Sequence, residues 1–214
     1  MKKILFLLLI IVFVTSYSSN KSKVVTKSQE TKTPFVWEGA NVYFLLTARF
    51  KNRNPNNDKI ILRDKPTGVL RGFEDGNIRG VIQKIDDGYF TDLGINAIWM
   101  TPIVDQIHGS VDEGSGNTYG FHGYWTKDWT TLDTSFGTRE DLSEVVQKAH
   151  TKGIRIMLDA VINHTGQTTN LDPKYPENWV HSSPTCKYNS YNTNINCTLV
   201  HGLFDVKAES TEST

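Results

Sequence analysis

The stretch GIRIMLDAVINHTG, residues 153–166, joins a short apolar run to a polar end. Residues 154–159 have the length and apolar character of a buried strand, and the run closes on the carboxylate of Asp159. Asn163 and His164 follow before the pattern breaks at Gly166. The polar residues after this strand are either part of a binding site or residues that cap a loop and form a turn.

The segments before this strand alternate between strand-like and helix-like patterns. Strand-like segments are short apolar runs, whereas helix-like segments have apolar residues at helical spacing and end at a glycine. In chain order they are strand-like residues 41–50, helix-like residues 80–94, strand-like residues 95–103 and helix-like residues 137–153. The last of these opens with Thr138 and Asp141 in a capping box. Apolar strands separated by amphipathic helices predict a βαβαβ arrangement, and therefore a parallel sheet with right-handed crossovers.

Ligands in parallel α/β folds lie at the carboxyl ends of the strands. The polar group at residues 159–164 is therefore predicted to lie where binding or catalysis occurs. A long aromatic-rich segment, residues 104–129, follows the second strand, and residues 167–214, rich in Tyr, Asn and Pro, follow the third. Long segments after consecutive strands favour a fold with a functional face at the carboxyl ends of its strands.

The composition is that of an ordinary globular protein: 214 residues, 38% hydrophobic, with 23 basic and 23 acidic side chains. A net charge of zero gives no reason to expect nucleic acid or an anionic membrane as a partner. The two cysteines, Cys186 and Cys197, could close a short disulfide loop in an exported protein, and they lack the spacing of a metal site. The sequence leaves open whether they are bonded.

The first residues predict export. Residues 1–19 combine two lysines, an apolar run and small polar residues, which is typical of a cleaved secretory signal peptide. An uncleaved anchor is the alternative, but the run of eleven apolar residues is shorter than the about 20 that span a bilayer. Residues 20–35, rich in Lys, Ser and Thr, predict a flexible linker. We therefore expect a secreted or periplasmic protein with no membrane association after cleavage.

Three motifs resemble the N-terminal part of the α-amylase family of retaining glycoside hydrolases. They are YGFHGYW at residues 119–125, LDTSFGTREDL at residues 132–142 and GIRIMLDAVINH at residues 153–164. The resemblance runs from about residue 42 to about residue 207. The loop PIVDQIHGSVDEGS, residues 102–115, is most similar to secreted and periplasmic bacterial α-amylases. The resemblance implies about three βα units of a (β/α)8 TIM barrel within residues 36–166, and the start of an inserted calcium-binding domain at residues 167–214.

The resemblance also implies a role for several side chains. Tyr124 would be the aromatic platform under the glucose at the cleavage point, because a sugar packs its C–H patch on an aromatic face. His164 would donate a hydrogen bond to a sugar hydroxyl, and His122 and Trp125 would line the adjacent cleft. Asp159 would be a carboxylate that supports the active centre. The alternative for each is a core or loop residue with no contact to a ligand.

The same resemblance implies two calcium sites, and Ca²⁺ prefers oxygen ligands such as Asn and Asp provide. Asn163 and Asp205 match ligands of an ion that joins the barrel to the inserted domain, with Asn194 and Asn196 as further candidates. Phe204 departs from the proline usual before that Asp, and Ala48 departs from an Asp often found before RF. The ligands implied at the second site are Asn52, Asn54, Asn57, Asp58 and Asn77, with the backbone of Asp75. A turn without metal would explain this segment as well.

Retaining glycoside hydrolysis needs two carboxylates about 5–5.5 Å apart. The resemblance places these two, and a third Asp that binds sugar hydroxyls, at the ends of strands four, five and seven, and no motif for these strands occurs in this sequence. We therefore expect an N-terminal fragment, inactive by itself and of low independent stability, of a protein that cleaves internal α-1,4 bonds of starch and maltodextrins. The full-length protein is expected to be monomeric. The alternatives are a cyclodextrin-hydrolysing or glucan-transferring relative and a non-catalytic glucan-binding protein.

Overall fold

The computed structural model describes residues 34–187, 189, 191, 197–198 and 203–207. The predicted signal peptide, most of the predicted linker, and Asn194 and Asn196 lie outside the described residues. The chain divides into two units, Met1–Val36 and Trp37–Thr214, and every helix and strand described belongs to the second. Within the described ranges, no helix has the length and apolar character needed to cross a lipid bilayer.

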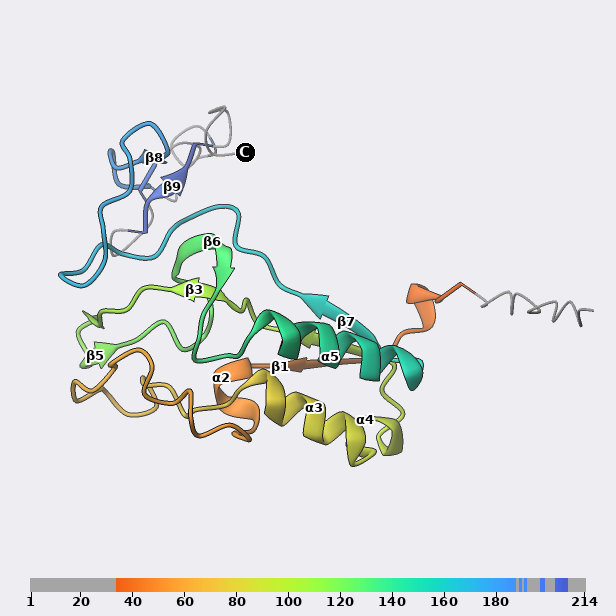
Figure 1. Ribbon diagram of the computed structural model, residues 1–214. Coiled ribbons are helices and arrows are strands. Elements are labelled where there is room, and N and C mark those ends of the chain that lie inside the picture. Colours follow the sequence, from red (N-terminus) through yellow and green to blue (C-terminus); the bar gives the residue numbers. More distant parts are fainter. Residues whose placement is uncertain (1–33, 188, 190, 192–196, 199–202, 208–214) are drawn as a thin grey trace, which may run out of the picture. The chain divides into compact units, whose positions relative to one another are not determined.

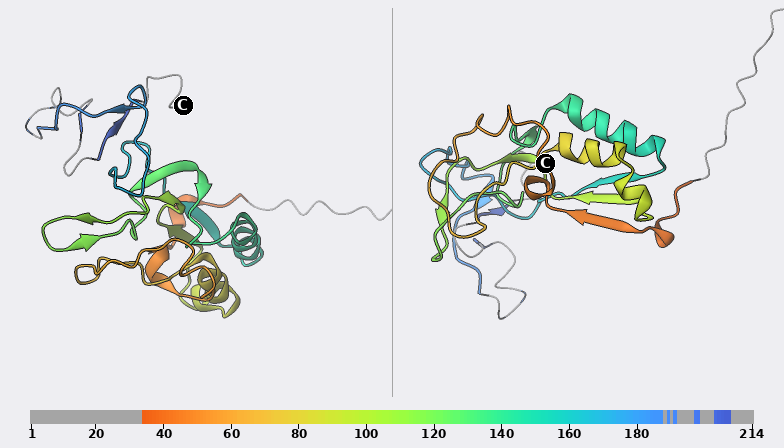
Figure 2. Two further views of the ribbon diagram at one scale, coloured as in Figure 1. Left: turned by 60° about the vertical axis from the view of Figure 1, so that its left-hand side comes forward. Right: turned by 90° about the horizontal axis from the view of Figure 1, so that it is seen from below.

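A three-stranded parallel sheet with the order β1-β2-β7 is the centre of the second unit (Figure 1). Its strands and the helices that connect them are β1 (Val42–Leu45), α2 (Thr47–Phe50), α3 (Ile78–Asp86), α4 (Tyr89–Asp92), β2 (Ala97–Met100), α5 (Arg139–Thr151) and β7 (Arg155–Leu158). Figure 2 shows α3 and α5 on the same side of the three strands. The parallel βαβαβ arrangement predicted from the sequence is confirmed.

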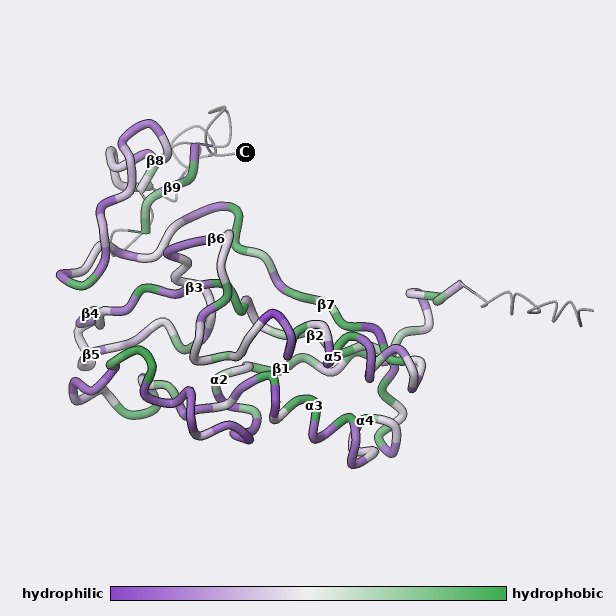
Figure 3. The backbone as a smooth tube through the Cα atoms, in the orientation of Figure 1, coloured by the Kyte–Doolittle hydropathy of each residue, from purple (hydrophilic) through white to green (hydrophobic). Residues whose placement is uncertain are grey.

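The two faces of this sheet differ in burial. Leu45 and Met100, in register on neighbouring strands, are at most 3% exposed and pack against the helices with the rest of the hydrophobic core. On the opposite face Phe44 and Trp99 meet edge to face, and these side chains are 46% and 38% exposed. In Figure 3 hydrophobic and hydrophilic residues alternate along α3, as expected of a helix with one buried face. The sheet thus has one buried face and one open apolar face.

The boundaries of three elements differ clearly from the prediction, and the second strand, expected over residues 95–103, covers only Ala97–Met100. The first strand was expected over residues 41–50, but it ends at Leu45. The backbone N–H of Thr101 donates to the carbonyl of Leu45, and the hydroxyl oxygen of Thr101 accepts the backbone N–H of Thr47. The chain therefore turns into α2. The helix expected over residues 80–94 is split into α3 and α4 at Gly88, whose φ of 81° is left-handed. The capping box of Thr138 at the start of α5 is confirmed.

The sequence predicted no helix or strand in residues 104–129, but three short strands and the start of a fourth lie there. They are β3 (Val104–Gln106), β4 (Val111–Asp112), β5 (Asn117–Thr118) and β6 (Thr126–Leu132). Antiparallel pairs join β3 to β6 and β4 to β5. A further antiparallel pair, β8 (Val180–His181) and β9 (Asp205–Val206), lies within the predicted inserted domain, and a short 3-10 helix, η1 (Trp37–Gly39), precedes β1.

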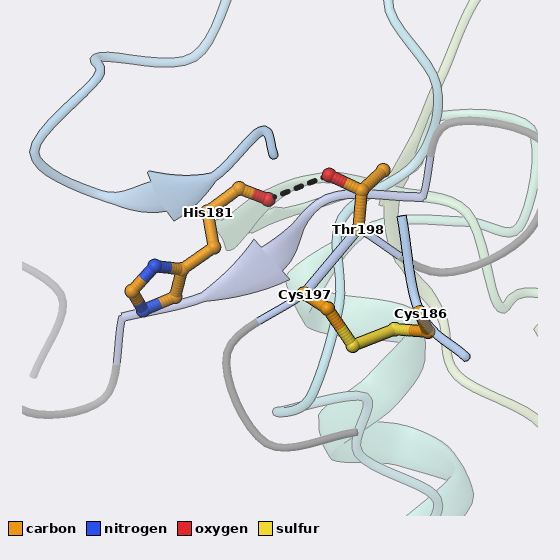
Figure 4. The surroundings of a disulfide bond; sticks show 4 residues. All are labelled: His181, Cys186, Cys197 and Thr198. Atoms are coloured by element: carbon orange, nitrogen blue, oxygen red, sulfur yellow. Dashed lines mark hydrogen bonds between the residues drawn. A yellow bond between two sulfur atoms is a disulfide. The ribbon is translucent and has the colours of Figure 1, made fainter. Parts of the chain in front are cut away.

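Cys186 and Cys197 form a disulfide, which answers a question that the sequence left open (Figure 4). The Cys186 N–H donates to the carbonyl of Thr198, and the Thr198 hydroxyl donates to the carbonyl of His181, each at 2.9 Å. In the chain-entropy model, closing a loop of this length contributes about 3 kcal/mol. The disulfide therefore joins the segments around Cys186 and Cys197, and the hydrogen bond of Thr198 to His181 connects them to β8.

Candidate functional site

Two segments distant in sequence meet at the carboxyl end of β7. The hydroxyl of Tyr124 donates a hydrogen bond of 2.7 Å to Oδ2 of Asp159, which directly follows β7. The Nε2 of His164 lies 3.1 Å from the backbone carbonyl of Tyr124, to which it donates. The other carboxylate oxygen of Asp159 accepts from the N–H of Ala160. Three of the five residues expected at the substrate site are thus joined by direct hydrogen bonds.

His122 and Trp125 surround Tyr124 from within the same motif. The rings of His122 and Tyr124 are stacked with centroids 5.8 Å apart, and the indole of Trp125 meets the imidazole edge-on at 4.9 Å. Trp125 is only 5% exposed, so it packs beneath the site. Gly123, between His122 and Tyr124 in the chain, has a φ of 90°, and a Cβ there would lie 2.4 Å from the carbonyl oxygen of Pro102. The turn that presents Tyr124 therefore requires glycine.

The imidazole of His122 is neutral at physiological pH. Burial lowers the pKa of His122 to about 4, an effect that the negative charge of Glu113 partly opposes. The Nδ1 of His122 accepts the backbone N–H of Tyr124 at 3.0 Å. The single proton of the neutral ring is therefore on Nε2, and this atom can act toward a ligand only as a donor.

His164 is in the same tautomer as His122, but here it is the Nε2–H that the protein itself uses. Burial lowers the pKa of His164, so the ring is neutral, and its Nε2–H is used by the carbonyl of Tyr124. Its Nδ1 is buried and has no hydrogen-bond partner. In this tautomer Nδ1 could only accept a hydrogen bond, but protein atoms cover it, so the donor role toward a sugar that the resemblance implied for His164 stays a prediction. Burial and the bond to Asp159 also raise the pKa of Tyr124 to about 12, which keeps the phenol protonated.

Arg49 joins the first strand to this site, and the sequence reasoning missed it. The residue lies in α2, directly after β1, and its guanidinium stacks 4.0 Å over the ring of Phe121, which meets His122 edge-on at 5.1 Å. The same guanidinium donates to the carbonyls of Leu70 and Gly72. Its position after the first strand, at the rim already predicted to be functional, was the available signal.

The structure brings Asn163 and Asp205, the two ligands expected at the interdomain calcium site, onto neighbouring chain segments. Asp205 and His164 form an isolated antiparallel β-bridge through their backbones. The N–H of Val206 donates to the carbonyl of Asn163 at 3.0 Å. Asn163 is exposed and Asp205 is half-buried. Among the described residues no three His, Cys, Asp or Glu side chains gather as a metal site would need. Two side chains are far fewer than the 6–8 oxygens that Ca²⁺ takes.

The second expected calcium site is a connected cluster. The amide nitrogen of Asn77 donates to Oδ1 of Asn52 at 3.0 Å, and Nδ2 of Asn52 donates to Asp58 at 2.9 Å. Asn52 also accepts the N–H of Asn54. Asn57 is 4% exposed and donates through Nδ2 to the carbonyl of Ser135. Hydrogen bonds thus link the side chains of Asn52, Asp58 and Asn77, whereas Asn54 joins through its backbone N–H and the amide of Asn57 bonds to Ser135.

The oxygens of this cluster suit a cation. Oδ1 of Asn57 and Oδ1 of Asp58 are both buried without a hydrogen-bond partner. Asp58 and Asp75 line a cavity of about 190 Å³, which Arg63 and Lys65 also line and the four asparagines do not. Burial raises the pKa of Asp75, and so do the negative charges of Asp58 and Glu74. A hard cation would give the unpaired oxygens a partner and relieve the repulsion between the carboxylates, so the residues fit Ca²⁺.

Comparison with known proteins identifies the family. The family model described as "Alpha amylase, catalytic domain" matches residues 44–194, and the chain belongs to this family. A periplasmic alpha-amylase from Escherichia coli (strain K12) is 44% identical over 147 residues, which are 67% of this chain and 21% of that protein. A cyclomaltodextrin glucanotransferase from Geobacillus stearothermophilus is 36% identical over 138 residues, 64% of this chain and 19% of the relative. The chain thus spans about a fifth of the length of these relatives.

Solved structures agree with this assignment. An Anoxybacillus alpha-amylase matches with a TM-score of 0.67 and 29% identity, over 84% of this chain and 36% of that one. An alpha-amylase from Geobacillus thermoleovorans, solved in complex with acarbose, matches with a TM-score of 0.64 and 30% identity over the same shares. These neighbours are TIM-barrel amylases, so the sheet and helices described here are a partial α/β piece of that fold.

Proposed function

We propose that this chain provides the glucan-binding rim of an α-amylase-type glycoside hydrolase that cleaves internal α-1,4 bonds of starch and maltodextrins with retention. The linkage of Tyr124 to Asp159 and His164 at the carboxyl end of β7, in a chain of this family, is the observation that carries the proposal. Residues 36–166 would supply three βα units of the barrel, and residues 167–214 would begin the inserted domain.

The chemistry of the rim suits a neutral sugar. The face of the Tyr124 ring would take the C–H patch of a glucose residue, while the bond to Asp159 and the stack against His122 hold that ring in position. Beside it, the Nε2–H of His122 would donate to a sugar hydroxyl. Neutral imidazoles and a protonated phenol match a substrate that carries hydroxyl groups and no charge.

Hydrolysis needs groups beyond these. Two carboxylates about 5–5.5 Å apart are required, whereas the carboxylate of Asp159 is engaged by Tyr124 and Ala160. We propose that the 214-residue polypeptide binds glucan without cleaving it. The identity to a cyclomaltodextrin glucanotransferase favours glucan transfer as a second candidate for the reaction of the whole enzyme.

Export is part of the proposal. The Escherichia coli relative is named periplasmic, and the Cys186–Cys197 disulfide is of a kind that persists in oxidising compartments. The predicted signal peptide at residues 1–19 would direct the chain there.

Glucan binding is tested by calorimetric titration of the 214-residue chain. We expect saturable heat with maltoheptaose and none with cellohexaose, because only the α-1,4 linkage presents successive rings along the curved path of an amylase cleft. Equal binding of both oligosaccharides, or of neither, would refute the proposed function. The cellohexaose arm is the control for nonspecific sugar binding.

We further propose that Ca²⁺ binds at Asn52, Asn57, Asp58 and Asn77, where it would supply positive charge and connect the segment before α3 to the start of that helix. A ligand present at 100 times its dissociation constant adds about 2.7 kcal/mol to the free energy of unfolding. Saturating Ca²⁺ should therefore raise the melting temperature of the chain, and EGTA should reverse the shift.

Two variants assign this calcium effect to one of the two expected sites. Asp58→Asn removes the charge of the cluster, and we expect it to abolish most of the thermal shift. Asn163→Ala, at the interdomain position, should keep most of it. A shift that survives Asp58→Asn and disappears in Asn163→Ala would place the dominant ion at the other site.

A further inference from the structure

A second concave site lies outside the cluster around Tyr124. It has a volume of about 600 Å³ and is lined by β6, by Ile162 and Thr165, and by the region of β8 and β9. Its aromatic lining consists of Trp129, Tyr175 and Trp179. Neither Tyr124 nor the residues that hold it contribute to this lining. The site is large enough for a small organic ligand, since such pockets measure about 300–1,000 Å³.

Two of the aromatic rings are held in place by the backbone. The indole N–H of Trp129 donates to the carbonyl of Val161 at 2.6 Å, and the hydroxyl of Tyr175 donates to the carbonyl of Thr126 at 2.9 Å. Their polar atoms are thus satisfied within the protein, which leaves the ring surfaces for contact with a ligand. Rings fixed before binding lose little conformational freedom when a ligand arrives.

The charged residues of the lining already have partners. Lys127 forms an ion pair with Asp105 at 3.3 Å, and Asp128 accepts from both the N–H and the hydroxyl of Thr130 at 2.7 Å. Lys127 is thus neutralised by Asp105, and the negative charge of Asp128, whose partners are neutral donors, would disfavour an anionic ligand. A neutral ligand with flat apolar faces and hydroxyl groups at its rim matches the lining best, and a pyranose ring has both features.

We propose that this pocket is a second α-glucan site that holds one or two glucose units against Trp129 and Trp179. The proposal rests on the proposed function, because it takes the ligand to be the same class of sugar. A long glucan held at Tyr124 and at this pocket would gain from the high effective concentration of its second contact.

Oxidation of individual tryptophans by N-bromosuccinimide, mapped by mass spectrometry, tests the pocket in the wild-type chain. We expect saturating maltose to slow oxidation of Trp179 at least fivefold. Trp37, which lies outside the pocket in η1 and is 51% exposed, is the internal control and should react at the same rate with or without maltose. An unchanged rate at Trp179 would overturn the proposal.

Variants separate this site from the one at Tyr124. Trp179→Leu should weaken maltose binding at least fivefold, Trp37→Leu should not, and Trp129→Phe should give a smaller loss because it keeps a ring. Tyr124→Ala should retain maltose protection of Trp179. Loss of that protection in Tyr124→Ala, with near-UV circular dichroism unchanged, would mean that maltose binds only at Tyr124 and would overturn the second site. If maltose protects Trp179 but Tyr124→Ala does not change the affinity for maltoheptaose, the proposed function is refuted and the second site is not.

Discussion

Tyr124→Ala is expected to weaken maltoheptaose binding on the order of 30-fold, the factor that about 2 kcal/mol represents for an aromatic residue at the centre of a binding site. The substitution removes the ring face and deprives Asp159 of its 2.7 Å hydrogen bond. It keeps the backbone carbonyl that anchors His164, so the effect reports on the side chain. Calorimetric titration of both proteins measures it.

Tyr124→Phe is the matched control for this substitution. Phenylalanine keeps the ring and loses only the hydroxyl that donates to Asp159, so we expect a loss of affinity of only a few fold. If affinity for maltoheptaose falls slightly in Tyr124→Phe and strongly in Tyr124→Ala, stacking on the ring is the main contribution of Tyr124 to binding. Wild-type affinity in Tyr124→Ala would show that the sugar does not lie on this ring.

Asp133→Ala is expected to produce the largest loss of stability, about 3–5 kcal/mol, because it leaves a buried guanidinium without its partner. Arg63 and Asp133 form an ion pair of 2.7 Å with side-chain exposures of 6% and 0%. The carboxylate also accepts the N–H of Gln106 and the N–H of Ser135. Urea unfolding followed by circular dichroism measures the change in the free energy of unfolding.

An exposed ion pair provides the comparison. Asp86 pairs with Lys148 at 2.6 Å, and both side chains are more than a third exposed, so Asp86→Ala should cost far less than Asp133→Ala. Equal losses in the two variants would contradict the role given to the buried pair. Arg63 also lines the same cavity as Asp58 and stacks over Phe73, which lines it too. The buried ion pair is therefore next to the proposed calcium cluster.

The sequence predicted the parallel sheet and the position of the site because both follow from local patterns. The apolar run before Asp159 and the helical spacing before Gly153 are visible in single segments, and the carboxyl-end rule then places Asp159 and His164 at the functional rim. The family motifs added Tyr124. The structure confirms that these residues meet, and their roles in binding stay predictions.

Other features depend on contacts between distant segments, and no local pattern encodes them. The pairing of β4 with β5 involves two residues on each strand, too few for a recognisable alternation. The turn of the chain after Leu45 depends on Thr101, a residue on the next strand. The tautomer of His164 is set by a carbonyl forty residues earlier and by burial. The stacking of Arg49 on Phe121 likewise joins α2 to a turn more than seventy residues later.

The open face of the sheet bears on the stability of the isolated polypeptide. Phe44 and Trp99 expose apolar surface there, and β1 and β7 are the edges of the sheet within the described residues. Apolar surface and unpaired strand edges both favour association with other chains. In a closed (β/α)8 barrel this face would form the packed interior. The low independent stability expected from the sequence thus has a physical basis in this face.

A crystal structure of the chain with bound maltotriose would test the central claim most directly, namely that the motif around Tyr124 and the polar end of β7 form one glucan site. We predict a glucose ring packed on the face of Tyr124, with a hydroxyl within hydrogen-bond distance of His164 or His122. A sugar bound only elsewhere, with the Tyr124 ring uncovered at saturating maltotriose, would contradict the account.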